Sequence, residues 1–240
     1  MMSRTAVRAL GQAEMTAITR SWLVRGWCGF AVIAAILPML SATAQDDNVS
    51  TLLGGWLIIY FIPSAILAAV FGASTISQDA EIAADSFLTR AVTRWDYVVA
   101  KLSSRAAVVA LIHLCATIPM LFLSARWGLN DSTTVGLLMT SFITGMMLVF
   151  LTAVGVCTGA VLRNLALAVV VIMCAVAAEG LIFGFLEIKE FSPTSVLNEL
   201  PETIRGDTTT WQELRVLLAF TAASLAGAAG AALAFQRREF

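Results

Sequence analysis

The chain has 240 residues, of which 59% are hydrophobic and 13% are charged, and its mean hydropathy is +0.85. Because a soluble domain is about a quarter charged, this composition excludes an ordinary soluble globular protein. The formal net charge of −1 has no strong sign that would indicate a charged partner, and we expect no nucleic-acid partner.

Six stretches are long and apolar enough to cross a bilayer, since a span needs roughly 20 mostly apolar residues. They are predicted at residues 22–44, 52–72, 106–125, 133–162, 165–186 and 214–235. The longest piece between them, residues 73–105, is about 33 residues long, which is shorter than a typical domain. We therefore predict an all-α, polytopic membrane helix bundle over residues 22–240.

The lysines and arginines predict the orientation of this bundle. With both termini inside, eleven of the 15 lie on the cytoplasmic side, where positive residues concentrate in membrane proteins. The four expected outside are Arg126, Lys189, Arg205 and Arg215. We therefore predict that both termini are cytoplasmic. The expected location is the bacterial cytoplasmic membrane.

The segment before the first span, residues 1–21, has Val7, Leu10 and Ile18 at helical spacing with polar residues between them. This pattern predicts a short interfacial helix on the inner leaflet. A frayed cytoplasmic tail is the alternative, because the apolar stripe is thin. Because residues 1–25 carry four arginines and no apolar run of the needed length, we expect no cleavable signal peptide.

The inner connection between the second and third spans, residues 73–105, mixes acidic and basic residues with aromatic side chains. Such a surface can dock in a cleft of a partner protein. The alternative is a solvated loop whose local ion pairs contribute little. The candidate contact residues are Asp79, Glu81, Asp85, Phe87, Arg90, Arg94, Trp95, Asp96 and Lys101.

Two features of the predicted spans concern how the helices pack. His113 lies about two turns into the third span, and we expect it to pack, with a proton-sensitive contact as the alternative. Residues 155–159 of the fourth span, and Ala223, Gly227 and Ala231 of the sixth, form faces of small residues that allow close helix contact.

Glu179 is the outstanding polar residue of the fifth span, because a carboxylate at mid-membrane costs roughly 2.5–3.5 kcal/mol. It either has a functional role, which is the usual reason for an acid inside a span, or it joins helices as a hydrogen-bonded carboxyl. Gly180 and Gly184 beside it have the Gly-x-x-x-Gly spacing of a helix contact face.

The only sizeable external segment, residues 187–213, contains Pro193, Pro201 and several aliphatic residues. A partly buried or re-entrant pair of short helices fits this pattern, because irregular backbone at membrane depth must be covered. Thr210 to Glu213 has the spacing of a capping box at the start of the sixth span, as has Thr93 to Asp96 before the third.

Catalytic motifs are absent from the sequence. Neither lysine, Lys101 or Lys189, belongs to a Gly-x-x-x-x-Gly-Lys-Ser/Thr loop, and the one histidine cannot form His-Glu-x-x-His. The four cysteines lie in apolar stretches without Cys-x-x-Cys spacing, which gives no support for a disulfide framework or zinc site. We expect no enzymatic activity, metal or cofactor in this chain.

Residues 89–101 resemble a motif that follows the second span in ABC-2 type transporter permeases. Its usual wording is close to Ser-Arg-Pro-Val-Ser-Arg, two variable residues, Tyr, two aliphatics, Gly and Lys. The matching positions are Arg90, Val92, Arg94, Tyr97 and Lys101. Ala91 replaces the proline of the motif, Ala100 replaces its glycine, and Ile82-Ala83 stand where a Gly-Thr pair is common.

The resemblance implies an ABC-2 (type V exporter-like) fold and a half-transporter membrane subunit. Such a subunit forms a homodimer or pseudo-dimer among membrane lipids. It recruits two separate ABC ATPase subunits, which bind ATP and Mg and grip residues 73–105 as a coupling helix. The resemblance also places the substrate route between the protomers, bordered by spans one, two and five, with Glu179 near an outward gate.

Three functions remain open at this point. The first is ATP-driven export of a hydrophobic or amphipathic substrate by a permease subunit. The second is a mechanical transmitter, in which the same ATPase-driven bundle moves an extracytoplasmic partner through residues 187–213. The third is a proton-coupled secondary carrier that uses Glu179 as its proton site.

Overall fold

The computed structural model describes residues 4–42, 49–77, 94–127, 131–162, 164–188 and 191–236. Nearly all of them are helical. The helices are α1 (Arg4–Arg20), α2 (Trp22–Ala42), α3 (Val49–Ser77), α4 (Arg94–Trp127), α5 (Thr134–Val161), α6 (Leu165–Ala177), α7 (Glu179–Phe185), α8 (Pro193–Asn198), α9 (Leu200–Arg205) and α10 (Thr210–Gln236).

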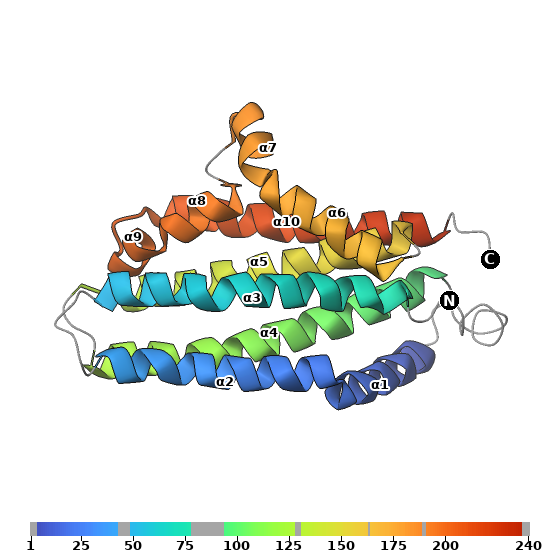
Figure 1. The fold of residues 1–240 in the computed structure, drawn as a ribbon, viewed down its shortest axis with the longest axis horizontal. Coiled ribbons are helices and arrows are strands. Elements are labelled where there is room, and N and C mark those ends of the chain that lie inside the picture. The colour runs from blue at the N-terminus through green and yellow to red at the C-terminus, as the bar shows by residue number, and fades with distance from the viewer. Residues whose placement is uncertain are drawn as a thin grey trace.

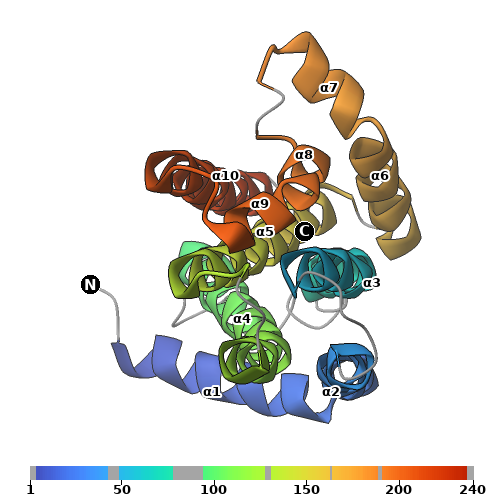
Figure 2. The same ribbon diagram turned by 90° about the vertical axis from the view of Figure 1, so that its left-hand side faces the viewer.

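The long helices α2, α3, α4, α5 and α10 run side by side along the bundle (Figure 1). Helix α1 and the last turn of α10 lie at one end, which we name the α1 end. The short helices α8 and α9, which we together call the hairpin, lie at the other end. We name it the hairpin end. Figure 2 looks along the bundle from the hairpin end and shows α1 crossing beneath it, with α6 and α7 at the periphery.

Within the described residues, four helices are individually long and apolar enough to cross a membrane: α3, α4, α5 and α10. Two bent pairs pass the same test, one joining the end of α1 to α2 at 64° and one joining α6 to α7 at 52°. The described residues therefore contain four to six candidate membrane spans. The predicted all-α membrane bundle is confirmed, and its orientation in the bilayer stays a prediction.

The segment expected to form an interfacial helix is helical, as α1, and a bend at Ser21 separates it from the first span. Ile18 is buried against the bundle. The helix is confirmed, whereas its position on the inner leaflet stays a prediction.

The fifth span differs from the continuous helix predicted over 165–186. Helix α6 ends at Ala177, and α7 begins at Glu179 in a new direction. The Glu179 carboxylate is bound by groups at the start of α8, and the hydropathy of the segment gives no sign of that contact. Figure 1 shows α7 projecting away from the bundle.

Helix α5 is the centre of the fold and contacts α3, α4, α6, α9 and α10. A Cβ built on Gly155 would lie 3.1 Å from the Cα of Gly72 in α3. On the α10 side, Gly227 faces Ala153, and Gly230 faces the Cys157 sulfur. The predicted small faces of spans four and six are thus confirmed, because only residues this small let the backbones approach so closely.

The start of α10 differs from prediction by one residue. The capping box is formed by Thr209 and Gln212: the Thr209 amide donates to Gln212 Oε1 at 3.1 Å, and the Gln212 amide donates to Thr209 Oγ1 at 3.3 Å. The predicted pair, Thr210 and Glu213, is wrong because Glu213 instead accepts from Thr208. The other predicted box begins at Thr93, outside the described residues.

Candidate functional site

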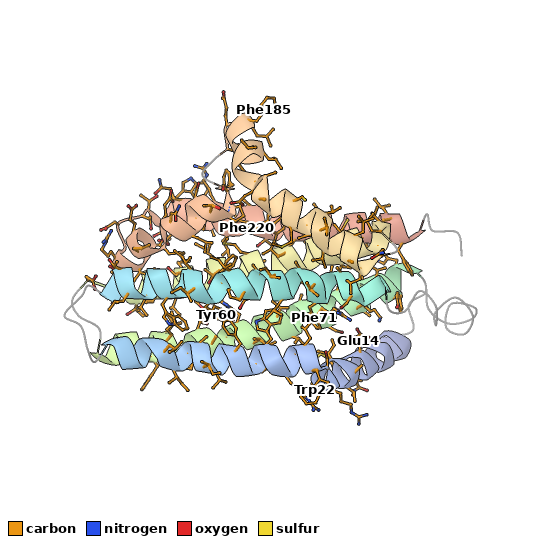
Figure 3. The ribbon with its side chains drawn as sticks, in the orientation of Figure 1. Glu14, Trp22, Tyr60, Phe71, Phe185 and Phe220 are labelled. Atoms are coloured by element: carbon orange, nitrogen blue, oxygen red, sulfur yellow. The ribbon has the colours of Figure 1, made fainter. Side chains whose placement is uncertain are left out.

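A buried ionic cluster joins α1 to α4 at the α1 end. Lys101 Nζ lies 3.3 Å from Glu14 Oε2, and Arg105 Nη2 lies 3.4 Å from Glu14 Oε1. The side chains of Lys101, Arg105 and Glu14 are 6%, 8% and 12% exposed. We call these three residues the Glu14 cluster; Figure 3 marks Glu14 on α1, beneath the long helices.

Helix periodicity places the basic side chains of the cluster on one face of α4. Tyr97, Lys101 and Arg105 recur every four residues, and residues four apart are neighbours on a helix surface. Lys101 Nζ lies 5.2 Å from the centre of the Tyr97 ring. That ring stacks on Phe235 of α10 with centroids 5.6 Å apart. The cluster therefore reaches α10 as well as α1.

Arg105 extends the cluster to the last turns of α3. Its Nη1 donates to the Phe71 carbonyl and, at 3.0 Å, to the Ser74 hydroxyl. Its guanidinium carbon lies 4.4 Å from the centre of the Phe71 ring. Because a buried charge that loses its partner is strongly destabilising, the cluster fixes the positions of α1, α3, α4 and α10 relative to one another.

Most of the predicted partner-contact residues lie at or beyond the limit of the described chain. Asp79, Glu81, Asp85, Phe87 and Arg90 lie outside the described residues. Trp95, in the first turn of α4, is 44% exposed. The helix also includes Arg94 and Asp96, whose side chains are not described.

Lys101 differs from these residues, because its side chain is buried on Glu14. Sequence reasoning did not single out Glu14 or Arg105 as members of a site. Two signals were available in the sequence: Glu14 is the only acidic residue before the first span, and Arg105 follows Lys101 by four positions. Neither signal shows that Glu14 and Arg105 contact each other.

Glu179 joins α7 to the beginning of α8. Its Oε1 accepts hydrogen bonds from the Thr194 amide at 3.0 Å, from the Ser192 hydroxyl at 3.3 Å, and from the Thr194 hydroxyl. These contacts join residues that are 13 and 15 positions apart in the sequence. The arrangement matches the reading of Glu179 as a hydrogen-bonded carboxyl that joins helices, and its role at a gate stays a prediction.

The glycines next to Glu179 contact little of the described chain. Gly180 is exposed, and a Cβ built on it would meet nothing within 4 Å; Gly184 is half-buried. The neighbouring apolar residues are exposed too, including Leu181 at 79% and Phe185 at 88%. Figure 3 shows Phe185 at the tip of α7, away from the bundle. This face therefore offers its surface to lipid or to another protein.

We predict that Glu179→Gln loosens the contact between α7 and α8. A neutral amide oxygen accepts hydrogen bonds of about 0.5–1.5 kcal/mol, whereas hydrogen bonds to a charged group contribute about 1.5–3 kcal/mol. Amide hydrogen exchange at Thr194 should therefore become about tenfold faster, with exchange in α5 unchanged. The exposed Glu187, on the same segment, provides the matched control, Glu187→Gln. Equal exchange in the two variants would contradict the prediction.

His113 lies in a polar layer between α4 and α5. Its side chain is 2% exposed. Its Nε2 lies 2.9 Å from the Ser141 carbonyl oxygen and 3.2 Å from the Thr144 hydroxyl, and its ring lies 5.8 Å from that of Tyr60. Since a carbonyl oxygen only accepts, Nε2 carries the proton. The residue packs within the bundle as expected, and proton sensitivity stays untested.

The segment between the predicted fifth and sixth spans forms the short helices α8 and α9, which pack into the hairpin end. Leu200 and Ile204 are 1% and 0% exposed, so the predicted partial burial is confirmed. The Thr133 amide donates to the Ile204 carbonyl at 2.9 Å. A Cβ built on Gly54 of α3 would lie 2.7 Å from Pro201 Cγ. The hairpin is therefore held by both α3 and α5.

Comparison with known proteins identifies a family. A protein-family model described as ABC-2 family transporter protein matches residues 6–240. No curated protein matches the chain.

Proposed function

The chain belongs to the ABC-2 family of transporter proteins, and on that premise we propose that it is the permease subunit of an exporter driven by two separate ATPase subunits. The family is a membrane component and not the ATPase, and it implies an ATPase partner. The chain is accordingly an integral membrane protein, and a bacterial inner membrane is the usual location for such proteins. ATP and Mg bind to the partner in this proposal.

The Glu14 cluster is the observation that carries the proposal. Helix α3 ends at Ser77 and α4 begins at Arg94, and both of these helix ends lie at the α1 end. An ATPase that grips the connection between the two helices moves the first turns of α4. Lys101 and Arg105, two and three turns into α4, pass that movement to α1, α3 and α10 through buried contacts. The α1 end faces the cytoplasm in this arrangement.

The exposed apolar surface of α6 and α7 supports the dimer that the proposal requires. Val170, Leu181 and Phe185 are each more than half exposed in the single chain. A second copy packed beside this surface covers part of it, and the route between the copies is lined by apolar side chains. A hydrophobic or amphipathic substrate suits such a route.

One observation favours the mechanical transmitter as a second candidate. The hairpin of α8 and α9 is anchored on α3 through Gly54 and on α5 through Thr133, so a movement of these spans would move the outer surface. The proton carrier has no such support: three hydrogen bonds to Glu179 are explained by a structural role.

The test is reconstitution with an ABC ATPase encoded in the same genome. We expect the ATPase to co-purify with this chain, and ATP to drive substrate movement in liposomes that contain no external partner protein. Charge reversal at Asp85 and Arg90 should abolish both association and ATP-driven movement. Reversal of Arg205, an exposed residue at the hairpin end, is the control and should change neither.

The possible outcomes separate the candidates. Association without substrate movement would favour the mechanical transmitter. Movement driven by a pH gradient without ATP, and abolished by Glu179→Gln, would favour the secondary carrier. Failure of any ATPase to associate would contradict both the exporter and the mechanical transmitter.

A further inference from the structure

The outward side of the bend between α1 and α2 is positively charged. Arg20 ends α1, Arg25 lies in the first turn of α2, and both side chains are exposed. Glu14 is the one acidic residue within 4–42, and its carboxylate faces the bundle as part of the Glu14 cluster. No carboxylate of α1 or α2 is therefore left on the outward side to neutralise the two guanidinium groups.

The rotation of α2 about its axis decides which side chains face outward at the bend. Trp27 is 1% exposed, and its Nε1 donates to the Ser64 hydroxyl of α3 at 3.2 Å, which fixes this rotation. Residues three apart share a helix face, and Trp22 and Arg25 are both exposed, Trp22 at 83%. Figure 3 marks Trp22 at the bend, on the side away from the long helices.

The guanidinium of Arg25 is held in position by its neighbours. Its Nε donates to the Thr19 carbonyl, in the last turn of α1, at 3.3 Å, and its guanidinium carbon lies 5.9 Å from the centre of the Trp22 ring. Within the part of the chain that the structure describes, no group accepts a hydrogen bond from its Nη1 or Nη2. The planar fork of an arginine matches the oxygens of a phosphate. Arg25 is thus oriented before an anion binds, and its terminal donors remain available.

The length of α2 places this group at the level of the lipid headgroups. Its 21 residues extend over about 32 Å, and the hydrocarbon core of a bilayer is about 30 Å thick. When α2 spans that core, its first turn lies at one boundary, where tryptophan rings are concentrated in membrane proteins. The exposed Trp22 ring beside the guanidinium suits a lipid, which has both a charged and an apolar part, better than a soluble anion.

We propose that the bend between α1 and α2 binds the headgroup of an anionic phospholipid, such as phosphatidylglycerol. The Nη groups of Arg25 bind the phosphate, Arg20 adds a second positive charge, and Trp22 lies where the headgroup meets the acyl chains. A zwitterionic lipid has the same phosphate, but its own cation opposes the two arginines. The binding goes beyond the proposed transport function and depends on neither its direction nor its partners.

The test uses Trp22 as the reporter of the lipid beside it. The purified full-length chain is reconstituted in phosphatidylcholine, and lipid with brominated acyl chains, which quench tryptophan fluorescence, replaces it in increasing proportion. Subtracting the signal of the Trp22→Phe variant leaves the emission of this one tryptophan. We expect brominated phosphatidylglycerol to bind beside Trp22 at least about fivefold more tightly than brominated phosphatidylcholine, the effect expected of one basic residue at an anionic surface.

The arginines are tested by removing their charges together. Arg20→Gln combined with Arg25→Gln should make the two lipids bind equally. Arg205→Gln, at an exposed arginine of the hairpin end, is the matched control and should keep the preference. Unchanged preference in the double variant, or equal quenching by the two lipids in the unmodified chain, overturns the proposal.

A salt titration of the unmodified chain keeps the test decisive if the double variant does not fold. Raising the salt from about 0.1 M to 1 M shortens the Debye length from about 10 Å to 3 Å. Because both arginines are exposed, we expect the preference for phosphatidylglycerol to fall at least about threefold over this range. A preference that does not change with salt would show that charge does not cause it, and would overturn the proposal.

Discussion

Arg105→Ala is expected to destabilise the folded protein by about 3–5 kcal/mol, because the groups that bind the buried guanidinium would stay buried without their positively charged partner. The guanidinium binds Glu14 of α1 and both the Phe71 carbonyl and Ser74 hydroxyl of α3. In the proposed exporter, its loss should also separate ATP hydrolysis from transport, since α4 would no longer be fixed to α1 and α3. The measurements are equilibrium unfolding in detergent and substrate moved per ATP hydrolysed.

Arg205→Ala is the matched control for this prediction. Arg205 also forms an ion pair, with Asp207 at 2.8 Å, but the side chains of the pair are 35% and 61% exposed. Such a pair contributes about 0–1 kcal/mol. A double-mutant cycle of Arg105→Ala with Glu14→Gln should give a coupling energy of about 0.5–3 kcal/mol. Equal stabilities for the two arginine variants, or strict additivity in the cycle, would show that the cluster does not act as a unit.

Gly155→Val is expected to prevent close packing of α3 against α5, and to lower the yield of folded protein sharply. A Cβ at this position would lie 3.0 Å from the Ala73 nitrogen and 3.1 Å from the Gly72 Cα. Both are backbone atoms, so a helix must move to accommodate the change. Overpacking costs about 1–3 kcal/mol, and occasionally more. The fraction eluting as a single species in size-exclusion chromatography, and its thermal midpoint, measure the effect.

Gly55→Val is the control for this packing prediction. Gly55 lies on α3, one of the two helices in contact, but it is exposed, and a Cβ there would meet nothing within 4 Å. Its replacement adds the same side chain to a helix without a steric conflict. We expect elution and thermal midpoint close to those of the unmodified chain. If the two variants behave alike, the contact between α3 and α5 is looser than the structure has it.

Much of the fold could be predicted from hydropathy and residue size. Every backbone polar group in a bilayer must be satisfied internally, so long apolar stretches in this chain become helices. Small residues at helical spacing, such as Gly155 and Gly159, likewise indicate the faces on which helices meet. These signals depend on residues close together in the sequence, and the structure agrees with them.

The break in the fifth span could not be predicted in the same way. Residues 165–186 are uniformly apolar apart from Glu179, and no proline interrupts them. The turn after Ala177 accompanies hydrogen bonds from Ser192 and Thr194 to the Glu179 carboxylate. The unusual residue was evident from the sequence, but its partners were not, because they lie beyond the span.

The sequence by itself determined that this protein is a membrane bundle, where its apolar helices lie, and which family motif follows the second span. Only the tertiary structure decided that Glu14 contacts Lys101 and Arg105, which lie on a helix about 90 positions further along the chain. Helical periodicity fixes which side chains of α4 share a face, whereas the identity of the helix opposite that face depends on how the whole bundle packs.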